Sequence, residues 1–441
     1  MRVLERAAAL GEVGAGLTLS PNAMLAVDWL GLGEAMSSRL SLPPWQVAED
    51  PHTGAEIGRL PRGEKAIDEY GAPYAFTHRA DLHEVLVAAV SALGDNVILT
   101  GKGCRAAGSE TDHAWVRTVD GEIFTADIVI GADGLHSAVR TSVAGEETPR
   151  FTGFIAWRGL LPYDQVPEGS LPAGSAITFG PGRCMVRYRL EHRGLMNFVA
   201  FAPQEASAEE SWSVEADPEV PARLFDEWHP ALAAILRASR AGSCHCWALF
   251  DRDPPSTYTF GRIALLGDAA HPMLPFLGLG AALALKDAVV LGRLLADGGG
   301  PLEALQRYST ARQPRGSAAQ LEARRTALRL HGQVEEDPRE INEETLDYFR
   351  YDAASVPLPT ANRLYCGELP IFPELNAQEQ TEAFFRPDGL IIDPRANSQV
   401  GNSRLGTLGA SWELSDEWSV NYLFGYTNTS VNSFGSRPEI R

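Results

Sequence analysis

The sequence predicts an α/β protein in which two parts of one layered domain enclose an antiparallel β-sheet domain. Two compact apolar runs end abruptly in glycine, one at 127–130 before Gly131 and one at 263–266 before Gly267. Runs of this kind are typical of strands buried in a layered α/β sheet. Between them, residues 150–250 contain segments rich in aromatic and branched residues, as expected for an antiparallel sheet. The chain therefore leaves the first α/β part, builds a sheet, and returns.

The first 150 residues contain the signals of two helices and several short strands. Arg2–Arg6 is typical of the end of a strand, and Ser20 before Pro21 can cap a helix whose first position is proline. A second helix follows Arg79, because apolar residues recur there at three- and four-residue spacing. Its predicted buried stripe is Leu82, Val85, Leu86, Ala89 and Leu93. A strand at 97–100 and a hairpin turn at Asp120-Gly121 come next.

The later segments continue the same plan. Strands are predicted at 154–161, 185–189 and 195–201, and an Ala/Leu-rich helix at about 281–296 precedes charged helical sequence to about residue 350. We therefore expect a first α/β part at 1–150, a substrate-binding sheet domain at 151–255, a second α/β part with C-terminal helices at 256–355, and a tail at 356–441.

The tail does not fit this plan. Residues 407–414 and 418–427 alternate polar and apolar side chains and carry several aromatic residues. This pattern resembles a hairpin from an outer-membrane β-barrel. Two strands cannot close a barrel, so a surface hairpin or a poorly ordered tail is the favoured interpretation over membrane insertion. A fused coding segment would also explain the pattern.

Composition limits the classes of function. The chain has 441 residues, 44% hydrophobic and 22% charged, with a net charge of −19. The negative charge argues against nucleic acid and anionic membranes as partners, although a local arginine cluster still permits an anionic small substrate. We expect no transmembrane helix and no secretory leader, and therefore a cytoplasmic protein. The sequence leaves a homodimer open.

The five cysteines favour neither a disulfide framework nor a zinc site. They are Cys104, Cys184, Cys244, Cys246 and Cys366. The count is odd, and no CxxC pair or matching histidine spacing is present. Cys244 and Cys246 would share one face of a strand, where ordinary packing is the favoured interpretation. This use of cysteine is typical of a reducing compartment.

Two motifs follow the buried strands. Gly131-Ala132-Asp133-Gly134 can bring the backbone close to a ligand, although a plain turn explains it equally well. Gly267-Asp268-Ala269-Ala270-His271-Pro272 is more specific, because it places Asp268 at the carboxyl end of a strand, where α/β proteins bind ligands. The glycines that follow, Gly278 and Gly280, can direct N–H groups of a helix start toward an anion. We expect Asp287, further along that helix, to be solvated.

A third motif, His78-Arg79-Ala80-Asp81-Leu82, places a guanidinium at a helix start. Arg79 can bind a phosphate there, or it can pair with Asp81 or another carboxylate.

In this order and spacing, the three motifs resemble the FAD-dependent aromatic hydroxylases of the salicylate hydroxylase type. The further matches are Val3-Leu4-Glu5-Arg6, Gly14-Ala15-Gly16, Ser20-Pro21-Asn22-Ala23, Ala156-Trp157-Arg158-Gly159, Trp228-His229-Pro230 and Trp247-Ala248-Leu249. The resemblance covers roughly residues 1–355 and excludes the tail. It implies a Rossmann-like FAD-binding fold of the GR2 type.

The resemblance also implies roles for individual residues. Glu5, beside Arg6, would hold the adenosine ribose, and Arg79 would lie near the FAD pyrophosphate. Asp133 and Gly134 belong to a motif associated with FAD and the nicotinamide cofactor. Asp268, beside Gly267, would bind the ribityl and pyrophosphate region. The residues expected along the flavin ring are Pro272, Pro275, Gly278, Leu279 and Gly280. His271 is not assigned as a base, and the catalytic residues remain unassigned.

The chain departs from the family at its start. The family places Gly-x-Gly-x-x-Gly after its first strand, about twenty residues before the ribose carboxylate, but here that carboxylate is Glu5. The string at 11–16 does not substitute, because it follows the second strand. We therefore expect a fold without the first strand and glycine-rich loop, and weak or absent FAD binding. Two smaller departures are Leu279, where relatives often carry Gln, and Lys286, where many carry Glu.

The implied reaction uses NAD(P)H to reduce FAD and O2 to form a flavin hydroperoxide, which hydroxylates a phenolic acid such as salicylate. The cofactor supplies this chemistry, and the protein supplies orientation and a dry pocket. The carboxylate of the substrate needs a cation, and the candidates in the sheet domain are Arg158, Arg187 and Arg189. Trp247 is a further candidate for binding the substrate. The pocket is expected from 154–161, 184–203 and 245–250, facing 272–280. A flavin oxidase or dehydrogenase on the same fold, and an inactive truncated or fused remnant, are the alternatives.

Overall fold

The computed structural model describes residues 1–11, 14–203, 214–239 and 244–330, together with four strands near the C-terminus. The chain divides into two compact units, Met1–Phe349 and Arg350–Arg441. In the described ranges, no helix combines the length and apolarity needed to cross a bilayer.

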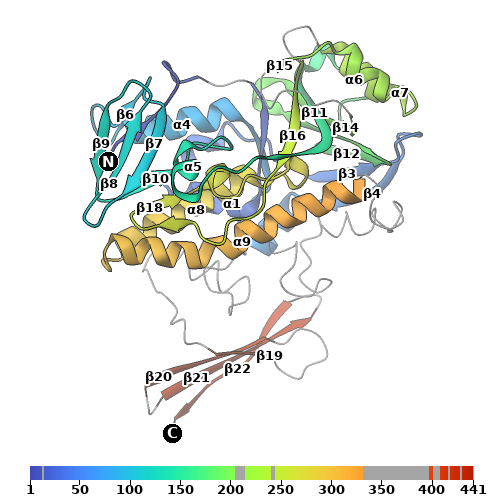
Figure 1. Ribbon diagram of the computed structural model, residues 1–441. Helices are drawn as coiled ribbons and strands as arrows, with labels where there is room; N and C mark the ends of the chain where they lie inside the picture. The colour runs from blue at the N-terminus through green and yellow to red at the C-terminus, as the bar shows by residue number, and fades with distance from the viewer. Residues whose placement is uncertain are drawn as a thin grey trace. The chain divides into compact units, whose positions relative to one another are not determined.

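Short parallel strand pairs form the α/β part of the first unit. β1 (Val3–Leu4) pairs with β6 (Ile98–Leu99), and β10 (Val129–Gly131) pairs with β18 (Ile263–Leu265). β17 (Thr259–Phe260) extends the second pair on its other side. Because β10 and β18 are paired although residues 150–251, which form most of the large sheet, lie between them in the sequence, the predicted return of the chain to the α/β part is confirmed (Figure 1).

Six of the eight strands of the large sheet lie between β10 and β18 in the sequence, and Figure 1 shows this sheet at the right of the unit. In spatial order its strands are β15 (Val214–Glu215), β16 (Cys244–Asp251), β11 (Arg150–Pro162), β14 (Leu195–Pro203), β13 (Arg183–Leu190), β12 (Ser175–Gly180), β3 (Trp45–Glu49) and β4 (Glu56–Pro61). All neighbours are antiparallel except β12 and β3. The sheet therefore contains the expected antiparallel strands and also recruits two strands from before residue 151.

Helices cover both the sheet and the α/β part. α6 (Glu219–Leu224) and α7 (Pro230–Ala238) pack on one face of the eight-stranded sheet, where Met185, Met196 and Phe198 are buried against them. The remaining helices are α1 (Pro21–Trp29), α2 (Gly33–Ser37), α3 (Glu64–Tyr70), α4 (Arg79–Ser91), α5 (Ala138–Ala144), α8 (Gly280–Ala296) and α9 (Pro301–Leu330).

Two smaller groups of strands complete the sheets described in this unit. β2 (Gly16–Leu19) pairs antiparallel with β5 (Ala75–His78). β7 (Cys104–Ser109), β8 (Ala114–Thr118) and β9 (Ile123–Ala126) form a meander. Gly121 has φ +91° between β8 and β9, which confirms the predicted hairpin turn and explains why glycine is needed there.

Two local predictions on the first helices need correction. Ser20 is the N-cap of α1, as predicted, but its side chain does not cap the helix and instead donates to Asn22 Oδ1. Leu93 was expected in the buried stripe of α4, but the helix ends before it and its side chain is 68% exposed. Leu82 and Val85 are buried as predicted.

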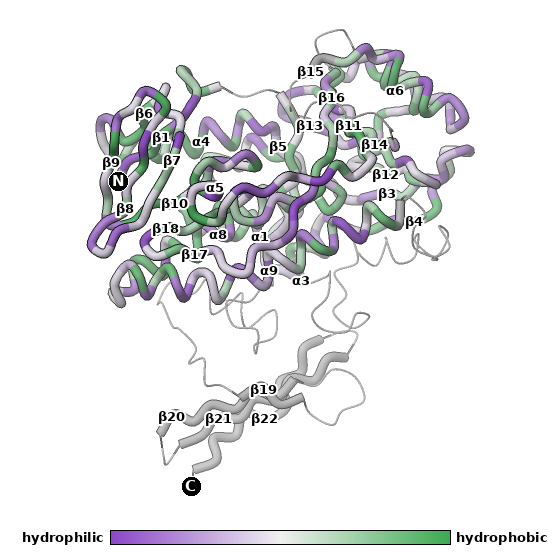
Figure 2. The backbone as a smooth tube through the Cα atoms, in the orientation of Figure 1, coloured by the Kyte–Doolittle hydropathy of each residue, from purple (hydrophilic) through white to green (hydrophobic). Residues whose placement is uncertain are grey.

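The long helix α9 has one buried side. Figure 2 shows hydrophilic and hydrophobic residues alternating along it. Its buried residues recur every three or four positions, at Leu305, Tyr308, Arg312, Arg315, Ala319 and Ala323. This spacing marks one face of an α-helix packed on the rest of the unit.

The described part of the second unit is a four-stranded antiparallel sheet. Its strands, in order, are β19 (Asn397–Val400), β20 (Leu408–Ser415), β21 (Trp418–Thr427) and β22 (Ser430–Ile440). The predicted hairpin between 407–414 and 418–427 corresponds to the antiparallel pair β20–β21. The expected helical sequence from 331 to about 350 lies outside the described residues, as does Cys366.

Candidate functional site

The loop after β18 carries the most specific motif of the sequence. The strand ends at Leu265, and the short 3-10 turn η3 (Gly267–Ala269) follows. Gly267 has φ +60°, and a Cβ there would lie 3.2 Å from the Ala284 side chain on α8. Glycine therefore permits both the backbone turn and the close approach of helix α8. The turn presents Asp268 outward while Gly267 and Ala269 are buried.

Asp268 lies at the start of helix α8. A Cβ built on Gly280, the first residue of that helix, would lie 3.9 Å from Asp268 Oδ1. The side chain is solvent-exposed. Burial nevertheless raises the pKa of its carboxyl, against the lowering effect of the charges on His271 and Arg79. The carboxyl is therefore accessible to solvent although protein around it hinders its hydration. We call the surface formed by Asp268 and the first turn of α8 the recess.

The segment between His271 and α8 connects this recess to the eight-stranded sheet. It contains the 3-10 turn η4 (Pro275–Leu277) and Gly278, whose φ is +64°. The Phe276 ring packs 5.6 Å from Phe154 and 4.9 Å from Phe201, centroid to centroid. Pro272 and Leu279 are buried, whereas Gly278 is exposed. The predicted flavin segment thus lies between Asp268 and one face of the sheet.

Arg79 and the residues after the first strand belong to the N-terminal part of the chain, far in sequence from Asp268. Arg79 is the first residue of α4, its side chain is exposed, and its charge acts on Asp268. Glu5 follows β1, and its Oε1 accepts a hydrogen bond of 2.7 Å from the backbone N–H of Ala7. Arg6 is exposed. The structure therefore relates Arg79 to Asp268 through the effect of its charge, whereas the roles of Glu5 and Arg6 stay expectations.

The Gly131–Gly134 motif lies between the end of β10 and the N-cap of helix α5, Ser137. The Asp133 carboxylate accepts hydrogen bonds from Ser137 Oγ and, at 3.1 Å, from the backbone N–H of Val139. Gly134 has φ +79°, and a Cβ there would meet open space. Asp133 therefore stabilises this helix start, and Gly134 leaves the surface beside it free for a ligand.

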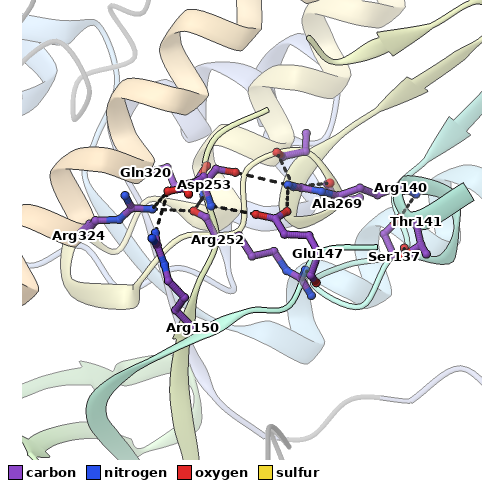
Figure 3. A network of polar contacts seen from close by, with 11 residues as sticks. Ser137, Arg140, Thr141, Glu147, Arg150, Arg252, Asp253, Ala269, Gln320 and Arg324 are labelled. Atoms are coloured by element: carbon purple, nitrogen blue, oxygen red, sulfur yellow. Dashed lines mark hydrogen bonds and ion pairs between the residues drawn. The ribbon is translucent and has the colours of Figure 1, made fainter. Parts of the chain in front are cut away.

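Arg140, on α5, ties this motif to the Asp268 loop (Figure 3). Its Nη1 donates to the carbonyls of Ala269 and Ala270, at 3.4 and 3.3 Å, and its Nη2 donates to Glu147 Oε2 at 2.7 Å. The same network includes Arg150, Arg252, Asp253, Gln320 and Arg324. The network therefore connects α5 and α9 with the start of β11 and with the residues that follow β16. The chain enters the sheet through β11 and leaves it after β16.

Asp287 was expected to be solvated, and that expectation is wrong. Asp287, His271 and Arg312 all have 0% of their side chains exposed. Asp287 Oδ1 accepts from Arg312 Nε at 2.6 Å, and Oδ2 lies 2.5 Å from His271 Nε2. In the sequence, Asp287 lies three to four residues from Leu283, Val290 and Leu291. A carboxylate within such an apolar stripe is the signal that it is buried and paired.

The alternation of side chains along the sheet separates the three candidate arginines. Arg158 is four residues after Phe154 on β11, so both side chains leave the same face, which is the face that Phe276 contacts. Its guanidinium lies 5.1 Å from the Trp247 ring centroid, and both side chains are buried. Arg158 and Trp247 are therefore on the side of the predicted flavin segment.

Arg187 and Arg189 leave the opposite face. Both are an even number of residues from Met185, which packs on the side of α6 and α7. Arg187 forms an ion pair with Glu49, and Arg189 Nε donates to the Pro172 carbonyl. These two candidates are not brought together with Arg158.

Three polar residues on the Arg158 face were not selected from the sequence. His245 lies directly opposite Arg158 on β16. Tyr188 and Asn197 are paired on β13 and β14, and Asn197 Oδ1 accepts a 2.8 Å hydrogen bond from Gly16 N. A Cβ at Gly16 would lie 2.5 Å from Tyr188 Oη, so glycine permits β2 to approach the sheet. Alternation on each strand would reveal these residues once the pairing is known, but the sequence does not specify the pairing.

The described cysteines are free. Cys244 is fully buried, and Cys246 packs against the same cluster on β16. Among the residues that the structure describes, no group of three or more His, Cys, Asp or Glu side chains is arranged to hold a metal ion.

Comparison with known proteins places these features in a family. The FAD binding domain family matches residues 1–323. A 3-amino-4-hydroxybenzoate 2-monooxygenase of Streptomyces cremeus is 38% identical over 333 residues, covering 75% of this chain and 81% of the relative. A 3-hydroxybenzoate 6-hydroxylase of Aquipseudomonas alcaligenes is 34% identical, covering 73% and 81%. The solved structure of a salicylate hydroxylase substrate complex has a TM-score of 0.64 at 26% identity, covering 80% of this chain and 90% of the other.

Proposed function

Because this chain belongs to the FAD-binding-domain family of FAD-dependent aromatic monooxygenases, we propose that it uses FAD, NAD(P)H and O2 to hydroxylate a phenolic acid such as salicylate. The observation that carries the proposal is the recess formed by Asp268 and the start of α8. The positive charge of Arg79 acts on the Asp268 carboxyl there. The recess adjoins a segment that packs on the sheet face bearing Arg158.

The residues of the recess fit the chemical groups of FAD. Asp268 offers a carboxylate to the hydroxyl groups of the ribityl chain. Arg79 and the N-terminus of α8 offer positive charge to the pyrophosphate. Gly278, with its positive φ and exposed backbone, permits the flat ring to approach closely. Glu5 would serve the adenosine ribose, and Asp133 with Gly134 would flank the cofactor.

FAD, when bound, supplies the redox chemistry that activates O2 at the expense of the nicotinamide. The protein positions the aromatic acid and keeps water away from it. In this proposal the Arg158 guanidinium binds the substrate carboxylate, since a charge-assisted hydrogen bond to a carboxylate is strong and directional. The rings of Phe154, Phe201, Phe276 and Trp247 supply apolar surface around the substrate ring.

The substrate range is supported by the relatives, which act on hydroxylated and aminated benzoates. The first test is to titrate the purified chain with FAD, and then to assay salicylate, 3-hydroxybenzoate and 3-amino-4-hydroxybenzoate with NADH and NADPH under ¹⁸O2. We expect NAD(P)H consumption that depends on the aromatic acid, and one ¹⁸O atom in the product. An oxidised product without ¹⁸O would instead indicate a flavin oxidase or dehydrogenase.

The same titration tests the expectation that FAD binds weakly. Stoichiometric FAD in the protein as purified would contradict that expectation and leave the hydroxylase proposal in place. A chain that binds FAD but consumes no NAD(P)H with any acid of the panel would contradict the proposed activity.

A further inference from the structure

The buried group formed by Asp287, His271 and Arg312 has no part in the proposed chemistry. None of the three side chains has exposed surface. A buried carboxylate is stable only when opposite charge and hydrogen bonds compensate its lost hydration. Burial alone would raise the pKa of Asp287, but the charges of His271 and Arg312 lower the pKa below its usual value. The carboxylate is therefore ionised, and its hydrogen bonds are charge-assisted.

Two of the partners of Asp287 are the two ends of the loop that carries Asp268. Asp287 Oδ2 accepts from the backbone N–H of Gly267 at 3.3 Å and lies 2.5 Å from His271 Nε2. The backbone N–H of His271 also donates to the Gly267 carbonyl at 2.8 Å. One carboxylate oxygen thus holds the loop where it begins and where it ends.

The rest of the loop is held from a second side. Arg140 Nη1 donates to the carbonyls of Ala269 and Ala270. Asp268 is the one residue of 267–271 that is exposed, and it faces the first turn of α8. Asp287 lies on that same helix, two turns further on. Helix α8 therefore forms one side of the recess and also fixes the loop that projects Asp268 into it.

We propose that Asp287 is a positioning residue for FAD, acting through Asp268. By holding Gly267 and His271 together, it fixes the direction of the Asp268 carboxylate before the cofactor arrives. Preorganisation of this kind contributes affinity because the loop loses little freedom on binding. The inference rests on the proposed function in one respect, namely that Asp268 contacts FAD. An ion pair that merely stabilises the core is the competing interpretation.

A double-mutant cycle on FAD affinity separates the two interpretations. The variants are Asp268→Ala, Asp287→Asn and the double variant of the full chain, with FAD Kd measured by quenching of flavin fluorescence. We expect each single substitution to raise the Kd about tenfold or more. In the Asp268→Ala background, Asp287→Asn should change the Kd by no more than about twofold, because its effect passes through the missing carboxylate. Equal effects in both backgrounds would overturn the inference.

The matched control is Glu49→Gln. Glu49 is also a carboxylate paired with a buried arginine, Arg187, but on the sheet face away from Phe276. This variant should lower the Tm and leave the FAD Kd unchanged. If Asp287→Asn also lowers only the Tm, its role is structural and the inference fails. If Asp268→Ala leaves the Kd unchanged, the FAD site of the proposed function is wrong, which is a distinguishable failure.

A second measurement needs no bound FAD and covers the case in which Asp287→Asn folds poorly. His271→Asn keeps the carboxylate and removes the imidazole, which contacts Asp287 at one end of the loop and packs beside the Tyr258 ring. Amide hydrogen exchange is then followed in peptides spanning 262–272 of the wild type, this variant and Glu49→Gln. We expect His271→Asn to speed exchange there by about tenfold or more and Glu49→Gln to leave it unchanged. Unchanged exchange in His271→Asn would overturn the inference.

Discussion

Arg158 and Arg189 carry the same group on the same sheet but leave it on opposite faces. Arg158 shares its face with Phe154 and contacts Trp247, whereas Arg189 shares its face with Met185 and contacts Tyr163. Adjacent residues on a strand point to opposite faces of the sheet. A shift of either arginine by one position along its own strand would therefore move its side chain to the other face, and the face determines which arginine can meet a substrate. The residue type alone does not decide this.

Arg158→Gln is therefore expected to weaken binding of the aromatic acid by roughly 10- to 100-fold, since a charge-assisted hydrogen bond contributes about 1.5–3 kcal/mol. The measurement is the substrate Kd from perturbation of the flavin spectrum, together with KM. Arg158→Lys should recover part of the affinity, because it keeps the charge but loses the planar fork. Arg189→Gln is the control on the far face, and an equal loss there would refute the assignment.

Individual residues also show where sequence reasoning stops. Asp268 was identified because a specific string surrounds it, and the structure places it in the turn after β18, beside Gly280. The expectation that Asp287 is solvated is wrong because it considers only the position in the helix. It leaves out the apolar residues three and four positions away on both sides. The predicted roles of Glu5 and Arg6 stay proposals. A short motif does not specify where the end of β1, which they follow, lies relative to Asp268.

At the scale of elements, α4 is tied to the turn between β13 and β14 through Asp81. This carboxylate accepts two hydrogen bonds from Arg193, at 2.9 and 2.6 Å, and lies 2.7 Å from His192 Nε2. Burial alone would raise the pKa of Asp81, but the hydrogen bonds from Arg193 and His192 outweigh it and lower the pKa to about 2. The helix that begins with Arg79 is thereby joined to the sheet that bears Arg158.

Because of these hydrogen bonds to Asp81, the free energy of unfolding should decrease as the pH falls through the acidic range. Because the pKa of Asp81 is lower in the folded state than its ordinary 3.8, its contribution is complete above pH 4 and disappears as the pH falls toward 2. The shift corresponds to about 2 kcal/mol. Asp81→Asn should lower the free energy of unfolding by about this amount at pH 7 and by much less near pH 2.5, as measured by urea denaturation. An undiminished difference at the lower pH would contradict the account.

Periodicity predicted most of these elements, and its failures have a common physical cause. The helices after Ser20 and Arg79, the strand before Gly131 and helix α8 were all visible as local patterns. The joining of β3 and β4 to the large sheet was not, because strand pairing over long sequence separations leaves no local trace. Leu93 was misplaced because the end of a helix is less sharply encoded than its interior.

At the scale of the whole molecule, every site residue that the structure places lies in the unit Met1–Phe349. Deletion of Arg350–Arg441 is therefore expected to leave the FAD Kd and the substrate Kd within about twofold of those of the full chain, as for independent parts of a protein. The measurement is the pair of titrations described above, on the full and shortened chains side by side. A larger loss of affinity in the shortened chain would assign the second unit a part in the site.

The large-scale plan was predictable because the sequence shows two similar buried strands on either side of a sheet. The parallel register of β10 and β18, Val129 with Ile263 and Gly131 with Leu265, confirms that plan. The faces of the sheet were not predictable, and with them the identity of the arginine near the flavin segment.

The pairing of β10 with β18 also imposes an order of events on the growing polypeptide. When Gly131 leaves the ribosome, its partner Leu265 has not yet been synthesised, and at roughly 5–20 residues per second the wait is on the order of ten seconds. During that time the strand edge of β10 is open and the intervening sheet can assemble first. Asp268 and α8 emerge after the sheet, and α9 follows them, so a ligand can be captured only once the sheet has been synthesised. Slow translation or slow sheet assembly would lengthen this exposure, and would therefore cause aggregation before it caused a loss of catalysis.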